Sequence, residues 1–98
     1  ALVITGDGQI DAQTIGGKGP LGVALAARQH AIPVIALVGG LNIDERLLHE
    51  AGISAVVPIV TRPMPLEHAL RDAAHLVESA ALRVGYLLQV GIGLNLST

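Results

Sequence analysis

The sequence lacks cysteine, phenylalanine and tryptophan, and Tyr86 is its single aromatic residue. Without cysteine the chain forms neither a disulfide framework nor a thiolate metal site. With so few aromatic rings it has no platform on which nucleic-acid bases stack. Lys and Arg number 6 against 8 Asp and Glu, a formal net charge of -2 at pH 7, so no basic surface for a phosphate backbone is expected. We therefore expect no nucleic-acid partner.

Long apolar runs are also missing from the sequence. None approaches the ~18 residues that span a bilayer, and the N-terminus lacks the basic region of a signal peptide. We therefore expect a cytoplasmic protein with no membrane partner. Hydrophobic residues nevertheless make up 51% of the chain, so Ala, Val, Leu and Ile must build the core. That composition suits helices packed on a parallel sheet.

The apolar pattern predicts strands and helices in alternation. Strands are predicted over 1–5, 33–38 and 53–60, and helices over 20–31, 43–51 and about 65–89. This βαβαβα order is typical of a three-layer α/β fold with a mostly parallel sheet. Pro58 lacks a backbone donor and predicts either an edge position for the third strand or an early end of its pairing. Gly52 predicts the end of the helix over 43–51. Residues 90–98 lose the helical period, so we expect an irregular tail there.

The 98 residues fit a single α/β domain. Ala1 opens a core strand with no initiator Met and no element before it. We therefore expect a segment of a longer protein. Exposed strand edges and apolar faces of such a segment promote association, so self-association is expected when the chain is alone.

Glycines and polar side chains crowd the connection after the first strand, where residues 5–19 read TGDGQIDAQTIGGKG. In open parallel sheets, ligands bind outside the carboxyl ends of the strands, where this connection lies together with 39–44 and 61–65. Glycine amides, Lys18 and the helix after Pro20 favour an anion. Asp7 and Asp11 suit Mg²⁺ binding or proton acceptance. The alternative is a structural loop whose glycines only turn the chain.

Other motifs carry less chemistry. The glycine-rich connection fits neither the dinucleotide fingerprint, which needs glycine at Asp11, nor the Walker A motif, which needs glycine at Ala12. Asn42 and Glu45 have the spacing of a helix N-cap and its reciprocal acid. His68 and His75 are predicted on the solvated face of the last helix, with a spacing unlike that of metal ligands.

The segment LVITGDGQIDAQTIGGKGPLGVA resembles the signature of the bacterial type 1 glycerate kinase family, which typically reads LVITGEGRIDxQTxxGKxPxGVA. PVIALVGG, AGISAVVPIV and RPMPLEHAL follow in the family's order, so the resemblance covers residues 1 to about 88. It spans the last quarter or so of a family member. The resemblance implies a two-lobed α/β kinase that phosphorylates D-glycerate in the cleft between its lobes, with ATP and Mg²⁺.

The resemblance also implies which residues line that cleft: Gly6, Asp7, Gly8, Asp11, Gln13, Thr14 and Lys18. Asp11 would orient Mg²⁺ or accept the proton of the glycerate hydroxyl, with Asp7 as its partner and second metal ligand. Lys18 would neutralise a phosphate or the substrate carboxylate. Gln13 and Thr14 would make orienting hydrogen bonds.

Two positions depart from the family signature. Asp7 replaces the usual glutamate and shortens the reach of the carboxylate by one methylene. Gln9 replaces the usual arginine, and an amide cannot supply the charge-assisted bidentate contact of a guanidinium. The alternative function is therefore a noncatalytic α/β anion-binding module that lacks the full cleft. In either case we expect the 98-residue chain alone to be inactive.

Overall fold

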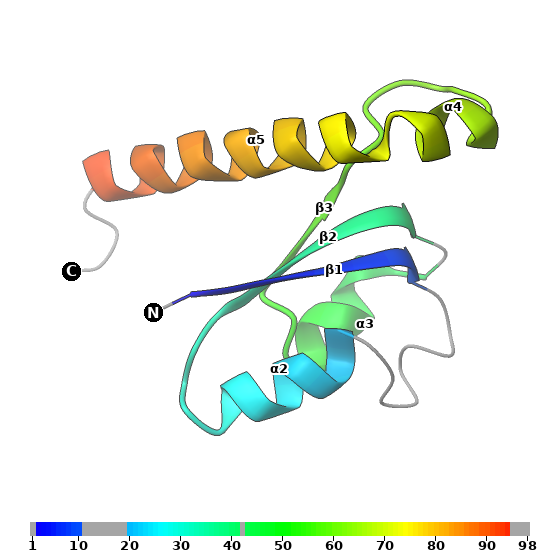
Figure 1. Cartoon of the computed structure of the whole chain (residues 1–98). Helices are drawn as coiled ribbons and strands as arrows, with labels where there is room; N and C mark the ends of the chain where they lie inside the picture. The colour runs from blue at the N-terminus through cyan, green and yellow to red at the C-terminus, as the bar shows by residue number, and fades with distance from the viewer. Residues whose placement is uncertain (1, 11–19, 42, 95–98) are drawn as a thin grey trace.

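The computed structural model describes residues 2–10, 20–41 and 43–94. Its elements are β1 (Val3–Ile10), α2 (Pro20–Arg28), β2 (Val34–Leu41), α3 (Glu45–Glu50), β3 (Ala55–Pro58), α4 (Leu66–Arg71) and α5 (Ala73–Gly93). The strands form one parallel sheet in the order β1-β2-β3. Helices α2 and α3 cover one face and α5 crosses the other (Figure 1). The predicted α/β class, with a parallel sheet between helices, is confirmed.

Strands β1 and β2 are both longer than predicted. Their paired residues continue through Asp7↔Val38 and Gln9↔Gly40 to Ile10↔Leu41. The prediction that the chain enters a loop at Gly6, and leaves the second strand at Gly39, was therefore wrong. Glycine lowers strand propensity, but the hydrogen bonds of a parallel ladder are made by the backbone and need no side chain.

Strand β3 is shorter than the predicted 53–60 and lies at an edge of the described sheet, as Pro58 predicted. Ser54 enters the ladder by donating its backbone N–H to the Val34 oxygen at 2.8 Å. Ile59 donates to the Val38 oxygen at 2.9 Å, directly after the proline that has no donor. Pairing ends there because the chain turns away toward α4.

The ends of the first helices differ from their predicted positions. Helix α2 ends at Arg28 rather than near Ala31, which has a φ of 55° and turns the chain toward β2. Helix α3 is capped by Asp44, whose carboxylate accepts the backbone N–H of Arg46 at 2.9 Å. The predicted cap, Asn42, lies outside the described residues. Gly52 has a φ of +111° and ends α3, as predicted.

The last predicted helix opens after Pro65, but Asp72 divides it into α4 and α5. Asp72 has φ -100° and ψ 14°, which departs from helical geometry. Helix α5 then continues to Gly93, so the expectation of an irregular tail was wrong for residues 90–93. Each glycine lowers the stability of a helix by about 1 kcal/mol, which weakens the helix without ending it. Residues 95–98 lie outside the described part.

Two apolar clusters hold the layers together. The cluster between the sheet and helices α2 and α3 consists of Ala24, Ala27, Val34, Ala36, Val38, Leu48 and Ile53. The cluster between the sheet and α5 consists of Leu37, Ala80 and Val84. Alanine at the contact points lets the helices approach a sheet that has no aromatic residue to fill wider gaps.

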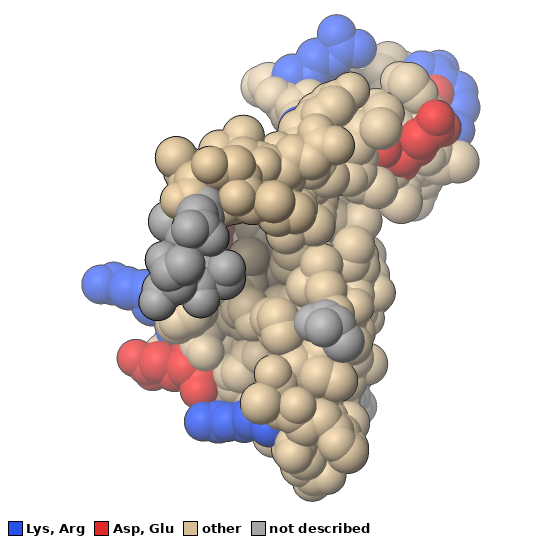
Figure 2. All heavy atoms as spheres, turned by 90° about the vertical axis from the view of Figure 1, so that its left-hand side faces the viewer, with Lys and Arg blue, Asp and Glu red and all other residues tan. Residues whose placement is uncertain are grey.

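The surface carries few charges. On the face shown in Figure 2, the Lys, Arg, Asp and Glu side chains gather in small groups near the margins and leave most of the face without charge. Among the described helices, none has an apolar stretch that could cross a membrane.

Candidate functional site

A cavity of about 620 Å³ opens on the α5 face of the sheet, between β1 and β2 on one side and α4 and the first turns of α5 on the other. Its lining residues are Ile4, Thr5, Gly6, Asp7, Gly8, Leu37, Gly39, Ile59, Val60, Leu66, Ala69, Leu70, Ala73 and Val77. Ligands of open parallel sheets bind at this edge because the connecting loops and helix starts converge there. The cavity is the candidate site.

The predicted site residues Gly6, Asp7 and Gly8 border the cavity from β1. Gly6 pairs with Leu37, which packs under α5, so strand alternation turns Gly6 and Gly8 toward the α5 side. Asp7 pairs with Val38, which packs under α2 and α3. The Asp7 carboxylate therefore belongs to the α2 face of the sheet edge, on the side from which the glycine-rich connection leads into α2.

The cavity face of β1 is open beside the glycines. A Cβ added at Gly8 would meet no atom within 4 Å among the described residues. The Cβ of an alanine at Gly6 would meet only the Leu37 backbone oxygen, at 3.7 Å. A ligand can therefore approach the β1 backbone closely, which is the use of glycine beside phosphates.

Four predicted site residues, Asp11, Gln13, Thr14 and Lys18, lie outside the described residues. They fall between Ile10, where β1 ends, and Pro20, where α2 begins. Their roles remain predictions. The backbone of Gln9 pairs with Gly40 in the last part of the sheet, one residue beyond Gly8, which lines the cavity.

Sequence reasoning missed the apolar wall of the cavity. Leu66 and Leu70 of α4 are 74% and 67% exposed and line the cavity together with Val77 of α5. These residues lie in the predicted helix over about 65–89. Their helical spacing is that of an apolar stripe that packs on a core. Figure 1 shows α4 beyond the end of the sheet, after the break that separates it from α5. Leu66 and Leu70 therefore line the cavity rather than pack on the sheet.

Binding of Mg²⁺ by Asp7 and Asp11 stays a prediction. Within the described residues, no group of three or more His, Asp and Glu side chains lies together. Mg²⁺ seldom uses a cage made only of protein; it is usually bound by one or two carboxylates, with phosphates and water completing the shell. Among the described residues that line the cavity Asp7 is the one carboxylate, and strand alternation places its side chain on the α2 face of the sheet. Asp11 follows directly after β1.

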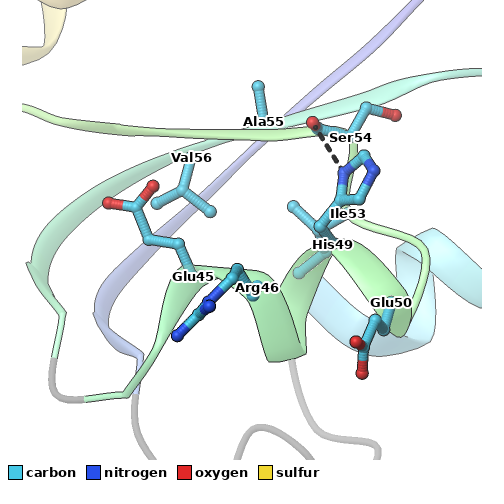
Figure 3. Close-up of a pocket in the computed structure, with 8 residues that line it drawn as sticks. All are labelled: Glu45, Arg46, His49, Glu50, Ile53, Ser54, Ala55 and Val56. Carbon is cyan, nitrogen blue, oxygen red and sulfur yellow. Dashed lines mark hydrogen bonds between the residues drawn. The ribbon is translucent and has the colours of Figure 1, made fainter.

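A second hollow, of about 480 Å³, lies between α3 and β3 (Figure 3). It lies at the amino end of the sheet, beside Ser54. The backbone carbonyl oxygen of Ser54 lies 3.3 Å from His49 Nδ1. Figure 3 shows the Glu45 and Glu50 carboxylates pointing in different directions, which is unsuited to holding one ion between them. This hollow therefore fits a ligand less well than the cavity at the carboxyl edge does.

The resolved pKa shifts of the described carboxyls occur away from the cavity. Hydrogen bonds from Arg46 lower the pKa of Asp44, and the hydrogen bond from Arg71 lowers the pKa of Asp72. Both pairs are exposed at helix starts, where an acid also interacts favourably with the helix dipole. They serve the fold rather than the candidate site.

Comparison with known proteins agrees with the motif at this edge. The model of the Glycerate kinase family matches residues 1–89. The chain is 45% identical to the glycerate kinase of Bacillus subtilis (strain 168) over 80 residues, which are 82% of this chain and 21% of that protein. It is 40% identical to the glycerate 2-kinase of Escherichia coli (strain K12) over 91 residues, 93% of this chain and 24% of that protein.

A third relative, the glycerate kinase of Halalkalibacterium halodurans, is 45% identical over 83 residues, 85% of this chain and 22% of that protein. The chain thus spans between a fifth and a quarter of the length of the curated relatives it matches. With a family match over most of its length and the signature segment at the carboxyl end of its sheet, this chain belongs to the glycerate kinase family.

Proposed function

We propose that this chain forms one wall of the active-site cleft of an enzyme that transfers the γ-phosphoryl group of ATP to a hydroxyl of D-glycerate. The observation that carries the proposal is the pairing of Gly6 to Ile10 with β2, which brings the family signature to the edge of the cavity. The names of the matched relatives support the same acceptor.

Phosphoryl transfer depends on positioning and charge neutralisation more than on covalent chemistry. In the proposed mechanism Asp11 accepts the proton of the attacking glycerate hydroxyl or orients the metal. Asp7 holds a second carboxylate within β1, where the ladder to Val38 limits its movement. Mg²⁺, when bound by these carboxylates, neutralises charge on the phosphates.

The remaining polar residues orient the anionic substrates. Lys18 neutralises a phosphate or the glycerate carboxylate, because an ammonium is a compact point charge. Gln13 and Thr14 donate and accept hydrogen bonds that fix the angle of attack. The open backbone at Gly8 leaves room for phosphate oxygens next to these groups.

The apolar wall supports different positions for the two substrates in the cleft. Ile4, Leu66 and Leu70 offer only aliphatic surface to the cavity. Glycerate is small, charged and rich in hydroxyl groups, so burying it against this wall would leave its polar atoms unpaired. The base of the nucleotide suits the aliphatic wall, and glycerate then binds away from that wall.

A coupled assay tests the proposal on the full-length enzyme that contains this chain. With MgATP and D-glycerate we expect turnover above that of a panel of other hydroxy acids. Asp11→Asn should lower kcat by ~10²-fold or more. Asp44→Asn, which changes a surface helix cap, is the matched control and should retain kcat. The absence of turnover on D-glycerate would overturn the function, and an unchanged kcat for Asp11→Asn would overturn the role of that carboxylate.

The alternative is that the chain is a noncatalytic anion-binding module. The glycine backbone of β1 beside the cavity would leave room for an anion in this case as well. A start codon immediately before Ala1 in the reading frame would support the module, and an upstream frame that encodes the remainder of the enzyme would support the kinase. We expect the chain of residues 1–98 alone to show no kinase activity in the same assay.

A further inference from the structure

Arg83, in the middle of α5, donates a side-chain hydrogen bond to the backbone carbonyl oxygen of Pro58, at the end of β3. The distance from Arg83 Nη2 to that oxygen is 3.3 Å, and the two residues are 25 positions apart in the chain. The bond therefore joins the two ends of a segment that contains the connection after β3, all of α4 and the first half of α5. We call this segment, residues 59–82, the helical arm.

The helical arm supplies half of the described residues that line the candidate site. Its contributions are Ile59, Val60, Leu66, Ala69, Leu70, Ala73 and Val77. The other half of the lining comes from β1 and β2. The shape of the cavity therefore depends on where the arm lies relative to the sheet.

Few apolar contacts hold the helical arm against the sheet. Within the described part of the chain, α4 has no buried residue, and α5 buries Ala80 and Val84. These two side chains pack with Leu37 in a cluster smaller than the one on the α2 face. Short side chains bury little apolar area, so they restrain the arm weakly. A hydrogen bond from a charged donor beside so small a cluster then has a large share in fixing the position of the arm.

The stability of the fold does not account for an arginine at position 83. Its Nε is buried and has no hydrogen-bond partner among the described residues. A buried donor without a partner costs as much free energy as a hydrogen bond contributes, or more. A methionine would fill the same space without that cost, because its side chain is unbranched and apolar. A role in placing the helical arm does account for the arginine.

We propose that Arg83 is a positioning residue, which holds the helical arm where the aliphatic wall of the cavity receives the base of the nucleotide. Arg83 is not among the residues that line the cavity, so it acts through Leu66, Leu70 and the other lining residues of the arm. The effect on nucleotide binding rests on the proposed function. The bond that fixes the arm does not, and it has a test of its own.

The first test is the steady-state kinetics of Arg83→Met in the full-length enzyme. A displaced wall weakens the binding of the ground state and of the transition state alike. The KM for ATP should therefore rise ~3–10-fold while kcat stays within about twofold of the parent. The Tm should stay within ~2 °C of the parent, because the variant removes the unpaired Nε together with the bond to Pro58.

Two further variants control this measurement. Arg83→Lys keeps a charged donor on a flexible stem, so its KM for ATP should lie between those of the parent and of Arg83→Met. Arg46→Met is the matched control, because it removes the same charge from a side chain that is 87% exposed and does not line the cavity. Its KM for ATP should equal that of the parent.

A double variant tests whether Arg83 acts through the wall. Leu70→Ala removes part of the aliphatic surface that the arm presents to the cavity. When Leu70→Ala and Arg83→Met are combined, the rise in KM for ATP should be smaller than the product of the two separate rises. Residues that act independently would give the full product.

Hydrogen exchange of the full-length enzyme tests the bond without reference to activity. In Arg83→Met, the backbone amides of residues 59–71 should exchange at least ~threefold faster than in the parent, because the arm opens more often. The amides of residues 34–41, in β2, should exchange at the parent rate. If the parent enzyme fails to turn over D-glycerate, the proposed function fails, and this comparison still decides the role of Arg83.

The proposal is wrong if residues 59–71 exchange at the same rate in Arg83→Met and in the parent. In an enzyme that does turn over D-glycerate, an unchanged KM for ATP in Arg83→Met would also overturn it. A fall in Tm and kcat together with the rise in KM would show that Arg83 supports the whole fold instead of placing the arm.

Discussion

A Cβ built on Gly39 would lie 2.6 Å from the backbone carbonyl oxygen of Gly8 on the neighbouring strand. No side chain fits in that space unless β1 and β2 move apart. The contact lies at the carboxyl end of both strands, on the rim of the cavity. Close approach of the two backbones there thus depends on glycine at position 39.

We predict that Gly39→Ala lowers the free energy of unfolding by ~1–3 kcal/mol, the usual cost of overpacking. Urea denaturation followed by circular dichroism measures this change. Gly8→Ala is the control, because its Cβ meets nothing within 4 Å, and its unfolding free energy should stay within ~0.5 kcal/mol of the parent. Equal stability of the two variants would show that the strands are not held this closely in solution.

Leu47 and Leu48 are adjacent on α3 and have opposite environments. Leu48 is 0% exposed in the cluster beneath α2 and α3, whereas Leu47 is 48% exposed. Leu48→Ala should lower the unfolding free energy by ~2–5 kcal/mol, because it leaves a cavity in the core. Leu47→Ala should cost less than ~1 kcal/mol in the same denaturation experiment. A larger loss at position 47 than at 48 would reverse the orientation of α3.

Asp44 predicts a dependence of stability on pH. Its carboxylate accepts the Arg46 backbone N–H and the guanidinium, and these hydrogen bonds lower its pKa below the ordinary value of 3.8. A carboxyl whose pKa is lower in the folded state stabilises the fold above its unfolded pKa, and this contribution is lost as the pH falls through the folded pKa.

Asp44→Asn keeps a neutral cap and removes the charge, so its Tm should be lower than that of the parent at neutral pH. The difference should shrink as the pH falls below 3.8, where the carboxyl of the unfolded chain takes up a proton, and should be lost below the lower pKa of the folded state. Thermal melts at several pH values measure it. A Tm difference that stays constant down to the most acidic melt would mean that the Arg46 contacts do not hold the charge.

Gln9 predicts a change in substrate binding. If the family arginine at this position contacts an anionic substrate, Gln9→Arg in the full-length enzyme should tighten binding by ~1–3 kcal/mol. The KM for D-glycerate and for ATP shows which substrate is contacted. An unchanged KM for both would mean that another cation serves this role or that position 9 faces solvent.

The sequence by itself determined the elements whose signals are local. Pro58 removes a backbone donor wherever it stands, so it predicted the edge position of β3 before any partner strand was known. Gly52 likewise predicted the end of α3, because only glycine adopts a φ of +111° at little cost. The signature that begins at Leu2 was sufficient to indicate the family.

The tertiary structure decided what depends on residues far apart in the chain. Gly6 and Gly8 carry turn propensity, yet hydrogen bonds to β2, about thirty residues further on, keep them in a strand. Leu66 and Leu70 have the period of a core stripe, yet the break at Asp72 makes them the wall of a cavity. Propensity and periodicity report only what a segment prefers, whereas pairing and packing supply free energy from partners that a local pattern does not contain.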